Sequence, residues 1–194
     1  KKSHGDKGQP TMTPFYDHAG ITIYHGDCRE ILPRLTDDIV TTFADPPYGV
    51  GKSEWDGAID TGWMDIVAAK TSACLAITPG IRNVLSYPSV VGEMEYRWML
   101  AVHIVNNVCR GDIGFGNWIG VLVYGKKGIS LYSQSQDCQD ISIRGDMPEH
   151  PSPKPLAAMA WILQRLPDGM VLDPFMGSGT TLVAAKQLGR RAIG

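Results

Sequence analysis

Several features are missing from this sequence of 194 residues, and each absence excludes a class of protein. No stretch approaches the roughly 18 uninterrupted apolar residues that a membrane span needs, and no apolar segment of a secretory signal follows the N-terminus. The four cysteines, Cys28, Cys74, Cys109 and Cys138, form no CxxC pair, so neither a zinc site nor a redox dithiol is indicated. We therefore expect a cytoplasmic protein without a membrane partner, whose cysteines stay reduced.

The sequence also lacks an excess of charge of one sign. It carries 18 basic and 20 acidic residues, a formal net charge of −2. This balance does not favour nucleic-acid binding, so any contact with DNA must come from a local basic face. The apolar share of 43% is typical of a globular protein. We expect a flexible leader over residues 1–15 and one folded domain over 16–194, with an inserted recognition element around 82–145.

Segments typical of strands and helices alternate along the chain. Apolar and β-branched runs predict strands at 21–24, 39–44, 73–77, 99–105, 118–124, 170–172 and 191–194. Apolar stripes predict helices after Asp60, from Pro155 and over 180–188. Such alternation indicates an α/β fold with a mainly parallel central sheet.

Two of the predicted strands end in unusual loops, and ligands of open α/β sheets bind beyond the carboxyl ends of strands. The first loop is Asp45-Pro46-Pro47-Tyr48. A carboxylate and a backbone carbonyl held side by side can accept both hydrogens of an –NH₂ group, and an aromatic ring beside them can stack on a planar base. A plain turn with an exposed aspartate is the alternative interpretation of the first three residues alone.

The second loop has the sequence DPFMGSGTT, from Asp173 to Thr181. Gly177 and Gly179 allow the backbone to approach a ligand closely, and the N–H groups of the following helix favour an anion. The loop has no P-loop lysine, and Leu182 stands where a dinucleotide fingerprint has its third glycine. These absences exclude an NTPase and a dinucleotide site, whereas a purely structural turn stays an alternative.

Taken together, the two loops resemble those of the S-adenosylmethionine-dependent DNA amino-methyltransferases, which methylate adenine N6 or cytosine N4. Because the Asp45 loop precedes the Asp173 loop, the order resembles the circularly permuted β class of that family. The resemblance covers about residues 21–194. It implies a Rossmann-like methyltransferase fold, a methyltransferase domain over 16–194 and a target-recognition role for the insertion around 82–145.

The resemblance also implies a role for each motif residue. Asp45, Pro46, Pro47 and Tyr48 would hold and stack the target base. S-adenosyl-L-methionine, without a metal, would be bound by Asp27, Ser152, Lys154, Pro155, Asp173, Pro174, Phe175, Gly177, Ser178, Gly179 and Thr180. The family usually has a ribose-binding acidic residue just after the strand that residues 191–194 begin. The sequence ends before that position, so we expect either truncation or incomplete ribose binding.

Double-stranded DNA is the partner that the resemblance implies. Basic side chains that are candidates for contact with its phosphates are Lys52, Lys126 and Lys127, followed by Arg82, Arg190 and Arg191. For any single one, an ordinary solvated surface charge is the more frequent role. Trp118 and Trp161 are expected in the core. A homodimer and a cognate restriction endonuclease are left open as further partners.

The chemistry indicated is direct transfer, since no cysteine follows a proline as in enzymes that methylate cytosine C5. We expect adenine N6 as the target atom, because Asp45 stands where cytosine N4 enzymes of the family often carry serine. Cytosine N4, an RNA base, a protein side-chain amide, and a non-catalytic DNA-binding module stay open as alternatives.

Overall fold

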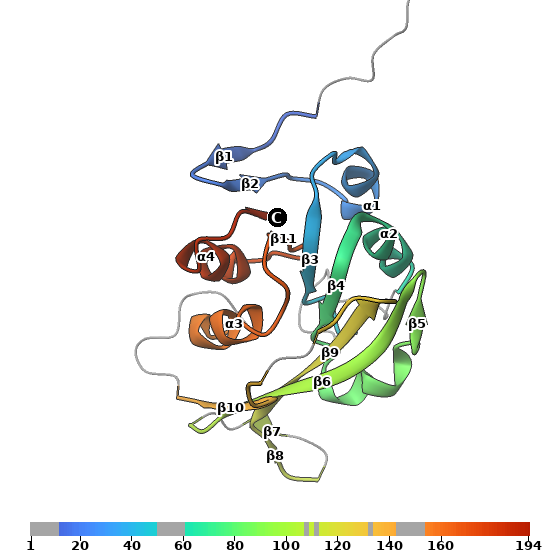
Figure 1. The fold of residues 1–194 in the computed structure, drawn as a ribbon. Helices are drawn as coiled ribbons and strands as arrows, with labels where there is room; N and C mark the ends of the chain where they lie inside the picture. Colours follow the sequence, from blue (N-terminus) through green and yellow to red (C-terminus); the bar gives the residue numbers. More distant parts are fainter. Residues whose placement is uncertain (1–11, 50–60, 107–108, 111–112, 132–133, 143–153) are drawn as a thin grey trace, which may run out of the picture.

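A computed structural model describes residues 12–49, 61–106, 109–110, 113–131, 134–142 and 154–194 (Figure 1). In this part of the chain, ten strands join in one sheet, in the order β1-β2-β12-β11-β3-β4-β9-β6-β10, with β5 paired to β6. Its strands are β1 (Tyr16–His18), β2 (Ile21–Ile23), β3 (Ile39–Ala44), β4 (Thr71–Ile77), β5 (Val90–Val91), β6 (Met94–Ile104), β9 (Trp118–Lys126), β10 (Cys138–Ile141), β11 (Met170–Leu172) and β12 (Ala192–Ile193). A separate small pair consists of β7 (Cys109–Arg110) and β8 (Phe115–Gly116).

The centre of the sheet is parallel, as the alternation of strands and helices predicted. Strands β2, β12, β11, β3 and β4 all run in the same direction. Strand β11 lies beside β3, with Val171 opposite Thr41 and Leu172 opposite Thr42. The carboxyl ends of these two strands therefore meet at one edge of the sheet, and the two predicted loops begin there.

Helices cover both faces of this sheet (Figure 1). Helix α1 (Cys28–Ile31), the 3-10 helix η1 (Leu32–Arg34) and helix α2 (Trp63–Lys70) pack on one face, and α3 (Leu156–Leu163) and α4 (Thr180–Gln187) pack on the other. Asp60, the predicted cap of α2, lies outside the described residues, and Gly62 occupies the N-cap position. Within the described residues, no helix combines the length and apolar character needed to cross a membrane.

The position of strand β3 between the two layers of helices explains why its sequence is almost continuously apolar. Phe43 packs in the core beneath α3 and α4, whereas Ile39 and Ala44 pack beneath α1 and α2. The two threonines of the strand are also buried, and each hydroxyl has a partner. Thr41 donates to the Pro167 carbonyl at 2.9 Å, and the Thr42 hydroxyl lies 2.5 Å from that of Thr71. The prediction of a strand buried on both faces is thus confirmed.

The segment around 82–145 contributes β5 to β10, and its long strands β6 and β9 extend the central sheet from β4. The prediction that Trp118 lies in the core is wrong, because this residue begins β9 and is 38% exposed. Its ring lies over Gly120, where a Cβ atom would come within 2.8 Å of it. Trp161, in α3, is buried as expected.

Candidate active site

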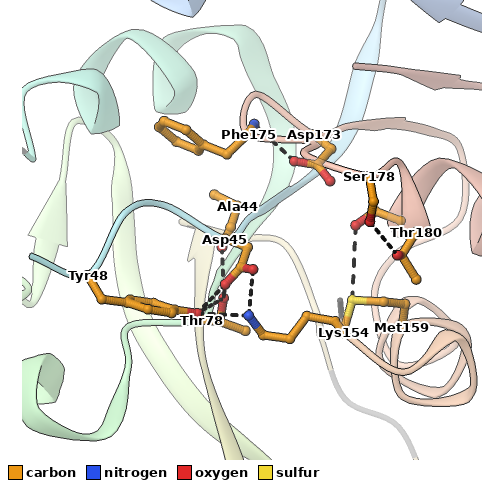
Figure 2. Close-up of polar contacts among 11 residues, drawn as sticks. Ala44, Asp45, Tyr48, Thr78, Lys154, Met159, Asp173, Phe175, Ser178 and Thr180 are labelled. Atoms are coloured by element: carbon orange, nitrogen blue, oxygen red, sulfur yellow. Dashed lines mark hydrogen bonds and ion pairs between the residues drawn. The ribbon is translucent and has the colours of Figure 1, made fainter. Parts of the chain in front are cut away.

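Asp45 follows the last residue of β3, and its carboxylate is held from three sides (Figure 2). Its Oδ1 accepts hydrogen bonds from the hydroxyls of Tyr48 and Thr78. Its Oδ2 pairs with the Lys154 ammonium at 2.5 Å. The side chains of Asp45 and Lys154 are only 25% and 17% exposed, so the ion pair is screened less than a surface pair. The arrangement fixes a carboxylate at the carboxyl edge of the sheet.

Thr78 is a residue of this site that the sequence analysis missed. It directly follows β4, the neighbour of β3, and its own backbone N–H donates to the Ala44 carbonyl at 3.0 Å. The residue is 1% exposed. The sequence shows only that Thr78 follows an apolar run, and it is the pairing of β4 with β3 that places this threonine at the same edge of the sheet as Asp45.

The Tyr48 ring is held against Gly80, which also follows β4. Gly80 has a φ of +68°, and a Cβ atom on it would lie 3.0 Å from Tyr48 Cδ1. The Asn83 side-chain amide donates to the Tyr48 carbonyl at 2.9 Å. On the other side, the Lys154 ammonium lies 3.0 Å from the Tyr48 hydroxyl and 5.2 Å from the ring centroid. These contacts fix the ring beside the Asp45 carboxylate.

Lys154 brings the segment before α3 into contact with the Asp45 loop, although 109 residues separate it from Asp45 in the sequence. The sequence analysis placed this lysine at the cofactor only. Pro155 is the N-cap residue of α3, and Ser152 lies outside the described residues. The structure thus shows that one predicted cofactor residue also touches the predicted base site.

Asp173 follows β11 and is almost completely buried, at 2% exposure. Its Oδ1 accepts the backbone N–H of Phe175 at 3.0 Å (Figure 2). Burial raises the pKa of this carboxyl from 3.8 to about 7, against the opposing effect of hydrogen bonds from Thr181 and the Phe175 N–H. Its charge is therefore sensitive to a cation placed nearby.

The glycines of the second loop adopt left-handed backbone conformations, with φ of +49° at Gly177 and +80° at Gly179. Gly179 caps α4, and its N–H donates to the Met176 carbonyl at 2.7 Å. A Cβ atom on Gly177 would meet only the Phe175 carbonyl, at 3.8 Å. The loop therefore presents backbone, without a side chain, beside the α4 N-terminus, where the Ser178 and Thr180 hydroxyls lie 3.2 Å apart.

A shallow, mainly apolar pocket lies next to this loop. Its lining residues come from the ends of β2, β11 and β12 and from α1 and η1, and they include Tyr24, Gly26, Cys28, Ile31, Pro174 and Gly194. Asp27 lies beside the pocket, but its carboxylate caps α1 and binds the Arg29 side chain, with an Nη2–Oδ2 distance of 2.6 Å. These hydrogen bonds lower the pKa of Asp27 to about 2.

The candidate phosphate contacts differ in their surroundings. Lys52 lies outside the described residues, Lys127 is exposed after β9, and the Lys126 ammonium lies 3.6 Å from Glu93. The expectation that Arg190 is a surface charge available to DNA phosphates is wrong. Its half-buried guanidinium donates to three backbone carbonyls, those of Leu163, Pro167 and Gly169, at 2.7–3.0 Å. Arg190 therefore ties α3 and the following turn to the segment before β12.

Comparison with known proteins identifies the family of this chain. Residues 98–194, half of the chain, match the family model described as DNA methylase, of the N6/N4 methyltransferase type. The chain belongs to this family. The chain is similar to the Type II methyltransferase M.ScaI of Streptomyces caespitosus, with 23% identity in an alignment that covers 93% of this chain and 78% of the relative. It is also similar to the Type II methyltransferase M2.MboI of Moraxella bovis, with 24% identity in an alignment that covers 92% of this chain and 83% of the relative.

Solved structures share the fold of this chain. The complex of M1.HpyAVI with SAM aligns with a TM-score of 0.71 and 25% identity, covering 90% of this chain and 92% of the other. The cytosine-N4-specific PvuII DNA methyltransferase aligns with a TM-score of 0.68 at 17% identity, covering 93% and 83%, which shows the fold alone. The chain has a Rossmann-like methyltransferase fold, and it is an S-adenosylmethionine-dependent DNA methyltransferase of the N6-adenine/N4-cytosine type.

Proposed function

We propose that this chain transfers a methyl group to adenine N6 in double-stranded DNA, with the Asp45 loop as base site and the Asp173 loop as cofactor site. The observation that carries this proposal is the position of the Asp45 carboxylate. It lies at the end of β3, beside the end of β11, and Tyr48, Thr78 and Lys154 fix its orientation.

The exocyclic amine of a base is a poor nucleophile while its lone pair is conjugated with the ring. Asp45 and the Pro46 carbonyl would accept its two hydrogens and favour a tetrahedral nitrogen whose lone pair is free. The negative charge of Asp45 also stabilises the positive charge that develops on this nitrogen, a contribution typically worth about 3–4 kcal/mol for a preorganised group. Asp45 is therefore proposed as the residue on which the rate depends most.

The Lys154 ammonium is paired with the Asp45 carboxylate, which is the group that would accept a hydrogen bond from the target amine. Two positive charges 4 Å apart repel by about 4 kcal/mol at an effective dielectric constant of 20. An ammonium on Oδ2 would therefore oppose the charge that develops on the target nitrogen. We propose that Lys154 turns away from Oδ2 in the reactive complex, while the hydroxyls of Thr78 and Tyr48 keep Oδ1 in place.

Methylation within a duplex requires the base to leave the helix, at a cost of a few kcal/mol. Tyr48 would offset part of this cost, because stacking of a base on an aromatic ring is worth roughly 1–3 kcal/mol. The contacts of its ring with Gly80 and of its carbonyl with Asn83 hold it ready for stacking.

The residues of the second loop and the neighbouring pocket fit S-adenosylmethionine, which supplies the methyl group as an electrophile on its sulfonium. The adenine ring would lie against the apolar lining beside Tyr24, Cys28 and Pro174, next to Gly26 and the Asp27 carboxylate. Gly177 and Gly179 would let the backbone approach the methionine part, with Phe175, Ser178, Thr180 and the buried Asp173 around it. Lys154 and Pro155 would close that end.

Cytosine N4 is the second candidate target, since a cytosine-N4-specific enzyme shares the fold. Adenine is favoured by Asp45 at the first position of the base loop, through the family resemblance. The relatives are named Type II methyltransferases. We therefore propose modification of DNA alongside a restriction endonuclease as the biological setting.

Expression in a bacterial host that lacks its own DNA methyltransferases tests the proposal. Nucleosides from the host DNA are separated and identified by mass spectrometry, with the Asp45→Ala variant as control. We expect N6-methyladenine with the wild-type chain and none with the variant. N4-methylcytosine alone would overturn the choice of base, and methylation found only in RNA or protein would overturn DNA as the substrate.

A further inference from the structure

The short helix η2 (Ile81–Ser86) exposes large apolar side chains next to the base site. Leu85 is 98% exposed and Ile81 is 51% exposed. The helix follows β4, so it lies at the sheet edge where β3 also ends in the Asp45 loop. Isolated exposed apolar residues are ordinary on protein surfaces, and it is the location of these two that calls for an explanation.

The inner side of η2 is firmly attached to the base site. The Asn83 amide donates to the Tyr48 carbonyl at 2.9 Å, and the Tyr48 ring rests on Gly80, the residue before the helix. Val84 and Tyr87 pack against the core cluster that covers the α1 and α2 face of the sheet. With its inner side fixed in this way, η2 presents Ile81 and Leu85 to solvent from a helix that is itself attached to Tyr48 through Asn83 and Gly80.

We propose that η2 is a DNA-insertion element, in which Leu85, supported by Ile81, enters the base stack of the duplex and fills the gap left by the target base. This inference rests on the proposed base-flipping function. Apolar side chains that enter between base steps recur in proteins that distort the duplex, because they replace part of the lost stacking. The occupant is double-stranded DNA, since the helix that carries these side chains is attached to the tyrosine proposed to stack on the flipped base. Arg82 adds an exposed positive charge between the two apolar residues, as expected for a surface that meets phosphates.

Duplex oligonucleotides carrying the methylated sequence, identified by sequencing of DNA treated with the wild-type chain, test this role. Initial rates are measured on a fully paired duplex and on one with a mismatch at the target base pair, which is easier to unstack. Removing the inserted side chain should lower the rate of Leu85→Ala on the paired duplex by about tenfold, and on the mismatched duplex by less than about threefold. Leu85→Met, which keeps an apolar side chain of similar volume, should retain most of the rate on both.

Val183→Ala is the matched control, because Val183 is 47% exposed on α4 and lies outside the proposed sites. It should leave both rates unchanged, and thermal denaturation should show that all variants are folded. Equal losses on the two duplexes, or no loss with Leu85→Ala, would overturn the insertion role. If Leu85→Ala instead dissociates a dimer in analytical ultracentrifugation and loses activity equally on both, the surface is an interface between copies and the proposal is wrong. Absence of methylation by the wild-type chain would overturn the proposed function itself, which keeps the two failures distinct.

Discussion

Replacing Asp45 by asparagine removes the charge of the proposed base site while keeping the shape of its side chain. In the structure, Oδ1 accepts two hydroxyl hydrogens and Oδ2 accepts the Lys154 ammonium, so all three protein neighbours are donors. An asparagine can offer its single oxygen to only one side, and its NH₂ group then faces another donor. The variant should therefore lose both the orientation of the acceptor and its negative charge.

The expected size of this effect follows from the charge on the transition state. Losing one preorganised stabilising group typically costs about 3–4 kcal/mol, so kcat for methyl transfer should fall by about 100- to 1,000-fold in Asp45→Asn. Binding of S-adenosylmethionine, measured by calorimetry, should weaken far less than kcat, by less than about tenfold, because Asp45 follows a different strand from the cofactor loop and is linked to the proposed cofactor residues through Lys154. A kcat within fivefold of wild type, or an equal loss of cofactor affinity in the folded variant, would refute this reasoning.

Three further predictions concern the cofactor loop and the fold. Gly177→Val should weaken S-adenosylmethionine binding by more than about tenfold in calorimetry, because a side chain there strains a φ of +49° and covers the exposed backbone. Gly189→Val, at a φ of +71° beyond the end of α4, is the matched control, and equal effects of the two would contradict the assignment of the loop. Arg190→Leu should lower the free energy of unfolding in urea by about 2–4 kcal/mol, through loss of its bonds to three carbonyls. Arg191→Leu should change the free energy of unfolding by less than about 1 kcal/mol, since Arg191 is exposed and its guanidinium lies 3.8 Å from the Asp37 carboxylate. Similar losses of stability in the two variants would contradict the structural role of Arg190. Asp173 has a raised pKa of about 7, so between about pH 4 and pH 7 the folded chain holds a proton that the unfolded chain releases. The contribution of this group to stability is therefore full below about pH 4 and is lost as the pH rises to about 7. The difference in unfolding free energy between wild type and Asp173→Asn should follow this slope, and a constant difference would contradict the raised pKa.

The parts of the fold that could be predicted are those determined by local sequence. Strand β3 begins and ends where its apolar run does, at Ile39 and Ala44, because two prolines after Asp45 cannot continue a central strand. Strand β11 likewise spans the predicted residues 170–172, ahead of a loop whose glycines begin a helix. Both loops could be assigned to one edge of the sheet because parallel strands place their carboxyl ends together.

The parts that could not be predicted depend on contacts between distant segments. Thr78 joins the site only because β4 lies next to β3, and Lys154 reaches Asp45 across 109 residues of sequence. Arg190 could not be recognised as a structural residue without knowing that the carbonyls around Pro167 converge on it. Trp118 was misassigned because an apolar strand pattern does not reveal how far the end of a strand projects from the sheet.

Transfer of an isotopically labelled methyl group tests the central claim most directly, namely that the two strand-end loops form one site for amino-methylation of DNA. The purified chain is incubated with unmethylated double-stranded DNA and S-adenosylmethionine carrying a trideuterated methyl group, and the DNA is digested to nucleosides for mass spectrometry. We predict labelled N6-methyladenine with the wild-type chain and a loss of at least about 100-fold in Asp45→Asn. Absence of label from every amino-methylated nucleoside with the folded wild-type chain, or full labelling with Asp45→Asn, would contradict the account.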